Sequence, residues 1–293
     1  MKQTLFILII FFSLNSFSQQ KKNESVPHKN IYIPLKIYKK EFKKPLTKQD
    51  SLNFKFSDSD TLVLVKNYIR PKGVSVPYEY KDSTFLHYYK KIAFNHKNDS
   101  LSKKTTMKYW KDDIKIFFSK SVSRKTKKEF MDFAESIDKK IDSLTVFEVK
   151  RVEDSNYIIY YFNDFEYESR MVNYKNSDYY MYWNGKNQIY RNTIKLDSKL
   201  FFNEKLRLYE LKKFFLKSLG HFNFISDFDC SSYFSNCYSK EKTLNLLDIE
   251  LLKYHYSYGI CKGTDLETFE EQHKIAKETL KKHNHKINFF HSE

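Results

Sequence analysis

Patterns of apolar and polar positions divide this chain of 293 residues into a short β-rich part and a longer mixed part. Apolar residues alternate with polar or aromatic ones over residues 31–37, which predicts a half-buried strand. Residues 61–68 form a second strand pattern, and prolines and a glycine interrupt the chain after it. We therefore expect a β-rich amino-terminal extension over residues 19–100, which opens with a polar lead and closes in a polar linker.

From residue 105 onward, strand patterns are combined with one early helix pattern. Residues 114–118 alternate as a strand. Thr126 and Glu129 then have the spacing of a capping box, in which each side chain satisfies a free backbone N–H at a helix start. Apolar residues three and four apart follow, from Phe130 to Leu144, and predict an amphipathic helix. Further strand patterns lie at residues 146–152, 157–162, 179–183 and 188–196.

Three helix patterns follow these strands. The first has an apolar face and reaches Gly220, a residue type that lets a helix end in the left-handed conformation. Asn245 and Asp248 have the spacing of a helix cap for the second, and Thr264 and Glu267 for the third. Strands with one early helix, followed by three late helices, predict an α+β fold.

The first residues have the pattern of a secretory signal. Lys2 precedes an apolar run over residues 5–14, and small residues before Gln19 suit a signal peptidase. A membrane anchor is the alternative, but about ten apolar residues are too few to span roughly 30 Å of hydrocarbon. We expect residues 1–18 to be a cleaved signal peptide and the mature protein to be periplasmic or extracellular, without a transmembrane segment.

The formal charge of +16 suggests an anionic partner. However, the lysines are spread along the whole chain and no arginine-rich patch occurs, so we expect no specific nucleic-acid surface. A general attraction to an anionic envelope component is the simpler interpretation.

Cys230, Cys237 and Cys261 are the only cysteines of the chain. In an oxidising compartment an odd count predicts one disulfide and one spare thiol. A bond between Cys230 and Cys237 closes a short loop and is our first expectation. The sequence leaves open a bond from either of them to Cys261.

Residues 209–220 have the length and closing glycine of a zinc-protease helix but not its ligands. Such a helix needs two histidines four residues apart, with a glutamate beside the first as general base. Lys213 and Lys217 occupy the two ligand positions, Phe214 the general-base position, and Asn223 the third ligand position. Two ammonium groups four residues apart repel a metal cation, so we expect neither a metal nor a cofactor here.

The chain resembles an uncharacterised exported bacterial family with a degenerate zincin-like fold. Residues 231–234 are similar to its serine-containing loop, and residues 243–263 to its segment of leucine, aspartate, tyrosine and glycine. Asp248 matches the aspartate of that segment, whereas Asn245 replaces a threonine. The resemblance covers roughly residues 110–263. It implies a zincin-like mixed sheet with an early packing helix, a degenerate active-site helix and carboxyl-terminal helices.

The resulting domain prediction places the zincin-like domain at residues 101–263 and a carboxyl-terminal helix with a polar tail at residues 264–293. The resemblance implies no established activity. We therefore expect a non-catalytic binding protein that uses the former substrate cleft.

The predicted binding residues of this cleft are Lys213, Lys217, His221 and Asn223. The two lysines would hold an anionic peptide or another anionic ligand, for example through a C-terminal carboxylate. The alternative interpretation is that they form an ordinary solvated helix face.

Two other function classes stay open at this point. One is a hydrolase or metal-dependent enzyme with a relocated site, for which His221, His255 and the cysteines would be the metal ligands. Paired carboxylates for glycoside hydrolysis are a further version, with Glu166 and Glu168 as the pair. The other class is a polyanion-binding accessory protein. Aromatic strands at residues 157–162 and 179–183 would serve as a ligand platform or, more simply, as buried sheet.

Overall fold

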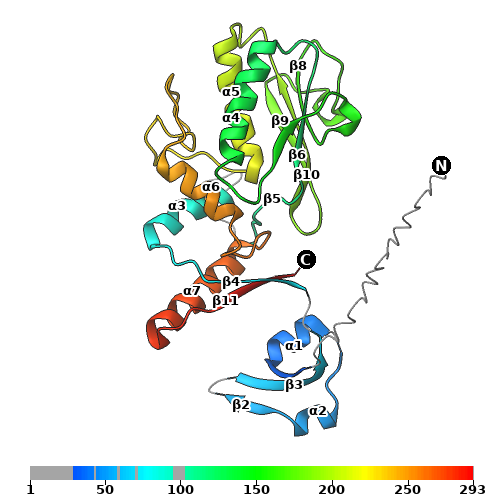
Figure 1. Cartoon of the computed structure of the whole chain (residues 1–293), viewed down its shortest axis with the longest axis vertical. Coiled ribbons are helices and arrows are strands. Elements are labelled where there is room, and N and C mark those ends of the chain that lie inside the picture. The colour runs from blue at the N-terminus through cyan, green and yellow to red at the C-terminus, as the bar shows by residue number, and fades with distance from the viewer. Residues whose placement is uncertain (1–28, 43, 58–59, 70–71, 95–102, 293) are drawn as a thin grey trace, which may run out of the picture. The chain divides into compact units, whose positions relative to one another are not determined.

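The computed structural model describes residues 29–42, 44–57, 60–69, 72–94 and 103–292. The expected signal peptide lies outside the described residues, as do most of the polar lead and most of the linker. Helices and strands are mixed along the described chain, which confirms the α+β class (Figure 1). The fold divides into two compact units, with the boundary between Lys72 and Gly73.

The first unit is a small antiparallel sheet with two short helices. Its strands β1 (Lys29–Pro34), β2 (Lys55–Ser57) and β3 (Asp60–Tyr68) pair in the order β1-β3-β2. The helices are α1 (Leu35–Phe42) and α2 (Lys48–Leu52). The strand expected to continue to residue 37 instead ends at Pro34, because proline has no N–H to donate to a ladder. Val63 is the one apolar side chain fully buried in the described part of this unit.

The second unit begins earlier than the sequence pattern suggested. Strand β4 (Gly73–Pro77) and helix α3 (Ser83–Phe94) belong to it, whereas we expected the extension to continue to residue 100. The reason is packing. Phe85, Tyr89 and Phe94 of α3 lie in the large hydrophobic core of the second unit.

The central sheet of the second unit is mostly parallel. It contains β5 (Tyr109–Trp110), β6 (Ile114–Phe118), β7 (Val146–Glu148), β8 (Tyr157–Tyr161), β9 (Asp178–Trp183) and β10 (Gln188–Leu196). The strands β5, β10, β8, β6 and β7 pair in that order and run parallel. Strand β9 pairs with β10 and is antiparallel to it. We expected one strand over residues 146–152, but only Val146–Glu148 form it, and the 3₁₀ turn η1 (Val152–Asp154) follows.

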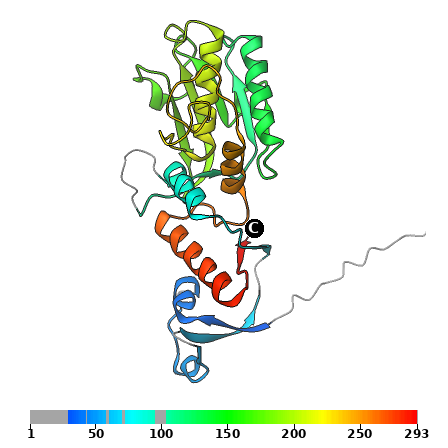
Figure 2. The ribbon, with the colours of Figure 1, turned by 90° about the vertical axis from the view of Figure 1, so that its left-hand side faces the viewer.

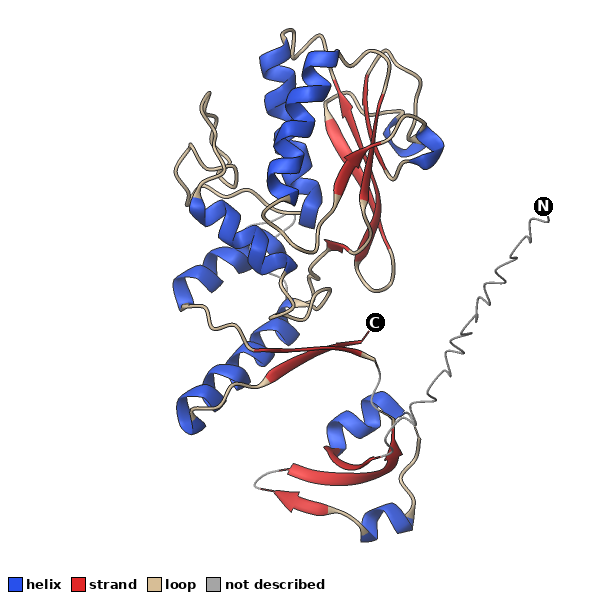
Figure 3. Ribbon diagram, viewed as in Figure 1, coloured by secondary structure: helices blue, strands red, loops and turns tan. Residues whose placement is uncertain are grey.

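Two long helices lie side by side on one face of this sheet: α4 (Arg124–Asp138) and α5 (Glu204–Gly220) (Figures 1 and 3). Phe130 of α4 and Phe215 of α5 are fully buried, and their rings meet at 5.3 Å. On the sheet side, Tyr157 of β8 packs on Phe215 and exchanges a 2.8 Å hydrogen bond with Ser218 of α5. This contact fixes the second half of α5 against the sheet.

The remaining helices complete the same core. Helices α6 (Leu246–Tyr256) and α7 (Leu266–His283) bury their apolar faces in it. Phe269 of α7 packs on Tyr89 and Phe94 of α3, and the two helices are adjacent in both views (Figures 1 and 2). A further 3₁₀ turn, η2 (Ser169–Met171), lies in the loop before β9. No helix of the described chain is both long and apolar enough to cross a membrane.

The end of the chain is not merely a polar tail. Residues Asn288–Ser292 form strand β11, which pairs antiparallel with β4. Phe289 is buried against Tyr78, with ring centroids 5.9 Å apart. The lysines and histidines before this strand suggested a polar tail, but Phe289 within the strand is a buried core residue.

Two helix starts differ from the sequence expectation, one by three residues and one by a single residue. Helix α4 is capped by Ser123, whose hydroxyl accepts from the N–H of Thr126; Thr126 is itself inside the helix. Asp265, not Thr264, caps α7. The predicted capping box of α6, between Asn245 and Asp248, is confirmed.

Candidate functional site

Helix α5 carries two of the four predicted binding residues. Asn203 begins it, because its side-chain oxygen accepts a 2.9 Å hydrogen bond from the N–H of Leu206. Leu211, Phe215 and Leu219 face the core and are fully buried. Lys213 and Lys217 are four residues apart and so project from a different side of the same helix.

Lys213 and Lys217 are half-buried, so a plain solvated face does not describe them. Lys213 forms a 2.5 Å ion pair with Glu210 of the preceding turn. The ammonium of Lys217 lies 5.1 Å from the ring centre of Phe224. Burial lowers the pKa of Lys217 and the charge of Lys213 lowers it further, against the opposing effect of Asp178 and Glu210. Within the described residues Lys217 has no ion pair within 4 Å.

Phe214, at the general-base position of the zinc-protease pattern, is a core residue. It is buried and its ring lies 5.9 Å from that of Tyr179 on β9. A phenyl ring has no group that could accept a proton from water, so this position supplies no general base.

His221, not Gly220, is the left-handed residue that ends α5, with φ of 53°. Gly220 is still helical, and its lack of a side chain has another cause. A Cβ at Gly220 would overlap the ring of Phe222 and lie 2.9 Å from His255 Nε2. The glycine is thus required by close packing rather than by backbone conformation.

His221 contacts two aromatic residues of β9. Its Nδ1 lies 3.0 Å from the hydroxyl of Tyr179, and its ring lies 5.8 Å from that of Trp183. Burial raises the pKa of Tyr179, and the nearby Asp178 adds to the shift, so this hydroxyl stays protonated at neutral pH. Tyr179, His221 and Trp183 therefore form one cluster where β9 borders the end of α5.

Asn223 is anchored by its backbone. Its N–H donates a 2.9 Å hydrogen bond to the carbonyl of Ile92 at the end of α3. No described contact joins Asn223 to the other three predicted residues. The structure thus brings Lys213 and Lys217 onto one side of a helix and places His221 beside β9, while Asn223 connects to α3.

The sequence suggested the aromatic strand at residues 179–183 as a ligand platform or as buried sheet, but did not connect Tyr179 and Trp183 with His221. Their signal is the alternation along β9, because residues 179, 181 and 183 point to one sheet face. Strand β9 also lies at the edge of the sheet, and among the described residues only β10 pairs with it. Its outer edge therefore has backbone N–H and C=O groups to which an extended chain can bind.

Lys108 is a further residue near Trp183 that the sequence did not indicate. It is buried, and its ammonium donates hydrogen bonds to Thr106 Oγ1 and, at 2.9 Å, to Asn187 Oδ1. It also lies 4.8 Å from the ring centre of Trp183. Burial lowers the pKa of Lys108 to about 8. Its contact with Trp183 places a lysine at the carboxyl end of β9.

The residues suggested for a relocated metal site have other partners. Cys230 and Cys237 form a disulfide with a Cα–Cα distance of 5.3 Å, so they provide no thiolate for a metal. His255 is buried, with Nδ1 3.0 Å from the hydroxyl of Tyr89 and Nε2 2.8 Å from the carbonyl of Lys108. Over the described ranges, no group of three or more His, Cys, Asp or Glu side chains is arranged to hold a metal ion.

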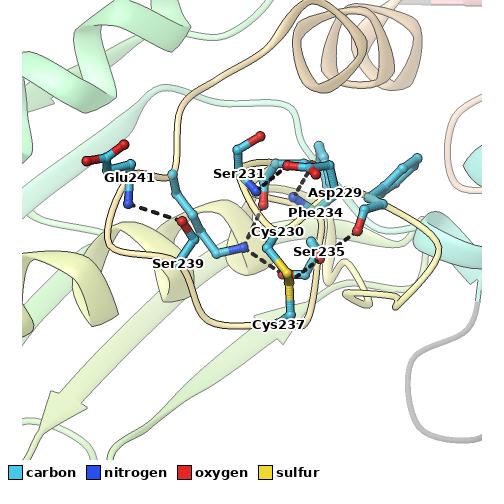
Figure 4. Close-up of a disulfide and its surroundings, with 11 residues drawn as sticks. Asp229, Cys230, Ser231, Phe234, Ser235, Cys237, Ser239 and Glu241 are labelled. Carbon is cyan, nitrogen blue, oxygen red and sulfur yellow. Dashed lines mark hydrogen bonds between the residues drawn. A yellow bond between two sulfur atoms is a disulfide. The ribbon is translucent and has the colours of Figure 1, made fainter.

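The disulfide confirms the first of the pairings expected from the sequence, and Cys261 is a half-buried free thiol. Figure 4 shows the loop around the bond, where Ser231 donates its N–H to Asp229 and Ser235 lies beside Cys237. Within this loop Ser232 donates a 2.6 Å hydrogen bond to Asp248 of α6. Asp248 is fully buried, and its carboxylate accepts a hydrogen bond from the N–H of Asn245, the residue that caps α6. The disulfide loop is thus joined to α6 by the hydrogen bond between Ser232 and Asp248.

Glu166 and Glu168 do not form an acid and base pair. Glu166 is bound by Lys195 and by the hydroxyl of Tyr160. Glu168 is buried and accepts a 2.8 Å hydrogen bond from the hydroxyl of Tyr182. These contacts fix the loop before β9 to the sheet, so both carboxylates have structural partners.

The chain matches no protein-family model, and no curated protein is significantly similar to it in sequence.

Proposed function

We propose that this protein is a non-catalytic, zincin-like binding protein that is exported to the periplasm or the extracellular space. Four features support the zincin-like description. The sheet is mixed, helix α4 packs early against it, and α5 follows its last strand. The antiparallel edge strand β9 lies beside the part of α5 where a zincin would hold its metal.

The chemistry of α5 supports the absence of peptidase activity. The two positions that would carry zinc ligands hold Lys213 and Lys217, and the general-base position holds the buried Phe214. Two ammonium groups on one side of a helix repel a cation and attract an anion. The same scaffold would therefore bind a ligand without cleaving it.

The ligand that suits this site is an extended peptide with a free C-terminal carboxylate. Its backbone would add to the edge of β9, as extended peptides do at exposed sheet edges. Its carboxylate would lie at Lys217, which has no ion pair among the described residues. The observation that carries the proposal is the joint position of Lys217, His221 and Tyr179 at one end of β9 and α5.

The proposal is tested by calorimetric titration of the mature protein with a pair of pentapeptides of β-branched residues. One has a free C-terminal carboxylate, and the other has a C-terminal amide. We expect the acid to bind about tenfold more tightly than the amide, and Lys217→Gln to abolish that difference. Lys139→Gln, which changes an exposed lysine at the carboxyl end of α4, is the matched control and should leave it unchanged.

Equal binding of the two peptides would refute the role of Lys217. One zinc ion per chain, with peptide cleavage that a chelator abolishes, would refute the non-catalytic function as a whole. Export is tested separately, by sequencing the amino terminus of the protein recovered outside the cytoplasm, which should begin at Gln19.

A further inference from the structure

A cavity of about 590 Å³ lies between the first turns of α4 and α5 and the loop that follows the disulfide. This volume is within the range of small-molecule sites, roughly 300–1,000 Å³. Five lysines line it: Lys125 from α4, Lys205 and Lys212 from α5, and Lys240 and Lys242 from the loop. The cavity is separate from the end of α5 described above, since neither Lys213 nor Lys217 lines it.

The cavity carries excess positive charge. Its two carboxylates are Glu129 and Glu204, and Glu204 is already engaged by Lys125, at 3.9 Å, and by the hydroxyl of Ser123. Lys212 has no ion pair within 4 Å among the described residues, and its ammonium lies 5.0 Å from the ring centre of Phe133. The amino ends of α4 and α5 add the positive ends of two helix dipoles.

Tyrosine rings form the other part of the wall. Tyr209 of α5 and Tyr238 of the loop have ring centroids 5.2 Å apart, and Tyr233 also lines the cavity. Tyr238 is 58% exposed, although such a large aromatic residue usually has most of its surface covered. An aromatic face beside lysines suits a ligand that has both rings and negative charges.

The loop wall is held in place by covalent and polar contacts. The Cys230–Cys237 disulfide closes the loop just before Tyr238 and Lys240 (Figure 4). Lys242 donates hydrogen bonds of 2.6 Å and 2.9 Å to the carbonyls of Ser232 and Ser235. The cavity therefore has three fixed walls, which is the condition for binding without a large ordering cost.

We propose that this cavity binds an acidic oligosaccharide, whose sugar rings lie against the tyrosines and whose negative groups contact the lysines. The lysines come from three segments around the cavity, which suits charges repeated along a short chain better than a single phosphate. Carboxylate and sulfate sugars share this chemistry. The inference is independent of peptide binding at β9, because it uses other residues of α5.

The test is calorimetric titration of the mature protein with three probes: trigalacturonate, a sulfated heparin trisaccharide and neutral maltotriose. We expect at least one acidic probe to bind and maltotriose not to bind. Binding of only one acidic probe identifies carboxylate or sulfate as the group recognised, and binding of both assigns the shared chemistry. Affinity should fall as salt rises from about 50 mM to about 300 mM, because exposed charges are screened.

The variant K212Q/K240Q should raise the Kd of the bound acidic probe about tenfold or more. Lys139→Gln removes the same charge type at the opposite end of α4 and should leave that Kd unchanged. Lys205→Gln, at an exposed position, gives a second test if the double variant has a lowered Tm. Failure of both acidic probes to bind, equal binding of maltotriose, or wild-type affinity in a folded K212Q/K240Q would overturn the proposal.

Discussion

The two halves of helix α5 present lysines in different ways. Lys205 in its first turn and Lys212 at its middle join three other lysines around an open cavity. In its second half, Lys213 is paired with Glu210, and Lys217 is half-buried against Phe224 beside an edge strand. One helix thus has a lysine-rich cavity at one end and a packed aromatic cluster at the other.

The position of a lysine in the sequence does not by itself reveal its role. In the sequence, the four lysines of α5 named above look like solvated surface residues. In the structure they differ in burial and in ion pairing. A lysine that is partly removed from water without a carboxylate partner lowers stability, and a bound anion removes that penalty. Such lysines are therefore the best candidates for ligand contacts at both ends.

The largest effect is expected where the carboxyl end is most tightly packed. Gly220→Ala should lower the free energy of unfolding by about 3 kcal/mol, because the added Cβ overlaps Phe222 and approaches His255. Gly185→Ala is the matched control, since no atom lies within 4 Å of a Cβ there. It should change the free energy by less than about 0.5 kcal/mol. Urea denaturation measures both, and equal effects would show that the end of α5 can relax around a side chain.

The free energy of unfolding should depend on pH through His273, and this dependence must be separated from any pH effect on ligand binding. Burial lowers the pKa of His273 from 6.5 to about 4, and the charges of Lys277 and Lys90 act in the same direction against a hydrogen bond to Phe269. The neutral ring therefore stabilises the fold above pH 6.5, and this contribution is lost as the pH falls toward 4.

Between about pH 8 and pH 5, the wild type should lose about 2 kcal/mol more of its free energy of unfolding than His273→Gln. Urea denaturation across that pH range measures the difference. Parallel curves for the two proteins would assign the acid sensitivity in this pH range to groups other than His273.

Replacing Lys217 and Lys213 by methionine should change the free energy of unfolding in opposite directions. Lys217→Met should raise the free energy of unfolding at pH 7 by about 1 kcal/mol, because it removes a poorly hydrated charge. Lys213→Met should lower it by about 1 kcal/mol, because Glu210 is buried and loses its ion partner. Thermal unfolding of the two variants provides the comparison. A loss of stability in Lys217→Met would mean that this lysine is structural.

The smallest effect concerns the contact between β9 and α5. Tyr179→Phe removes one hydroxyl near His221 and keeps the ring, so it should lower the free energy of unfolding by only about 1 kcal/mol or less. Peptide binding at β9 should weaken with it, whereas binding of the acidic sugar at the amino end should not change. Weakening at both ends would show that the two sites are coupled through α5.

The sequence predicted the class of fold well because alternation and helical spacing report burial directly. Strand β10 and the capping box of α6 occur where the pattern placed them. Errors arose where one residue competes with its neighbours. Ser123 takes the cap that Thr126 was expected to form, and His221 adopts the left-handed conformation that was expected of Gly220.

The candidate site could be predicted only in part. The positions of Lys213 and Lys217 on one side of α5 follow from helical spacing. The contacts of His221 with Tyr179 and Trp183 join residues about forty apart in the chain, and no local pattern reveals them. The lysine-lined cavity brings together three segments for the same reason, so it too was not predicted.

We propose above all that α5 has the position of a zinc-protease helix but binds an anion in place of a metal. The most direct measurement is metal analysis of the mature protein after dialysis against zinc, combined with titration of the free-acid peptide before and after addition of a chelator. We expect far less than one zinc per chain and an unchanged peptide affinity. One bound zinc per chain, with peptide binding or cleavage that the chelator abolishes, would contradict it.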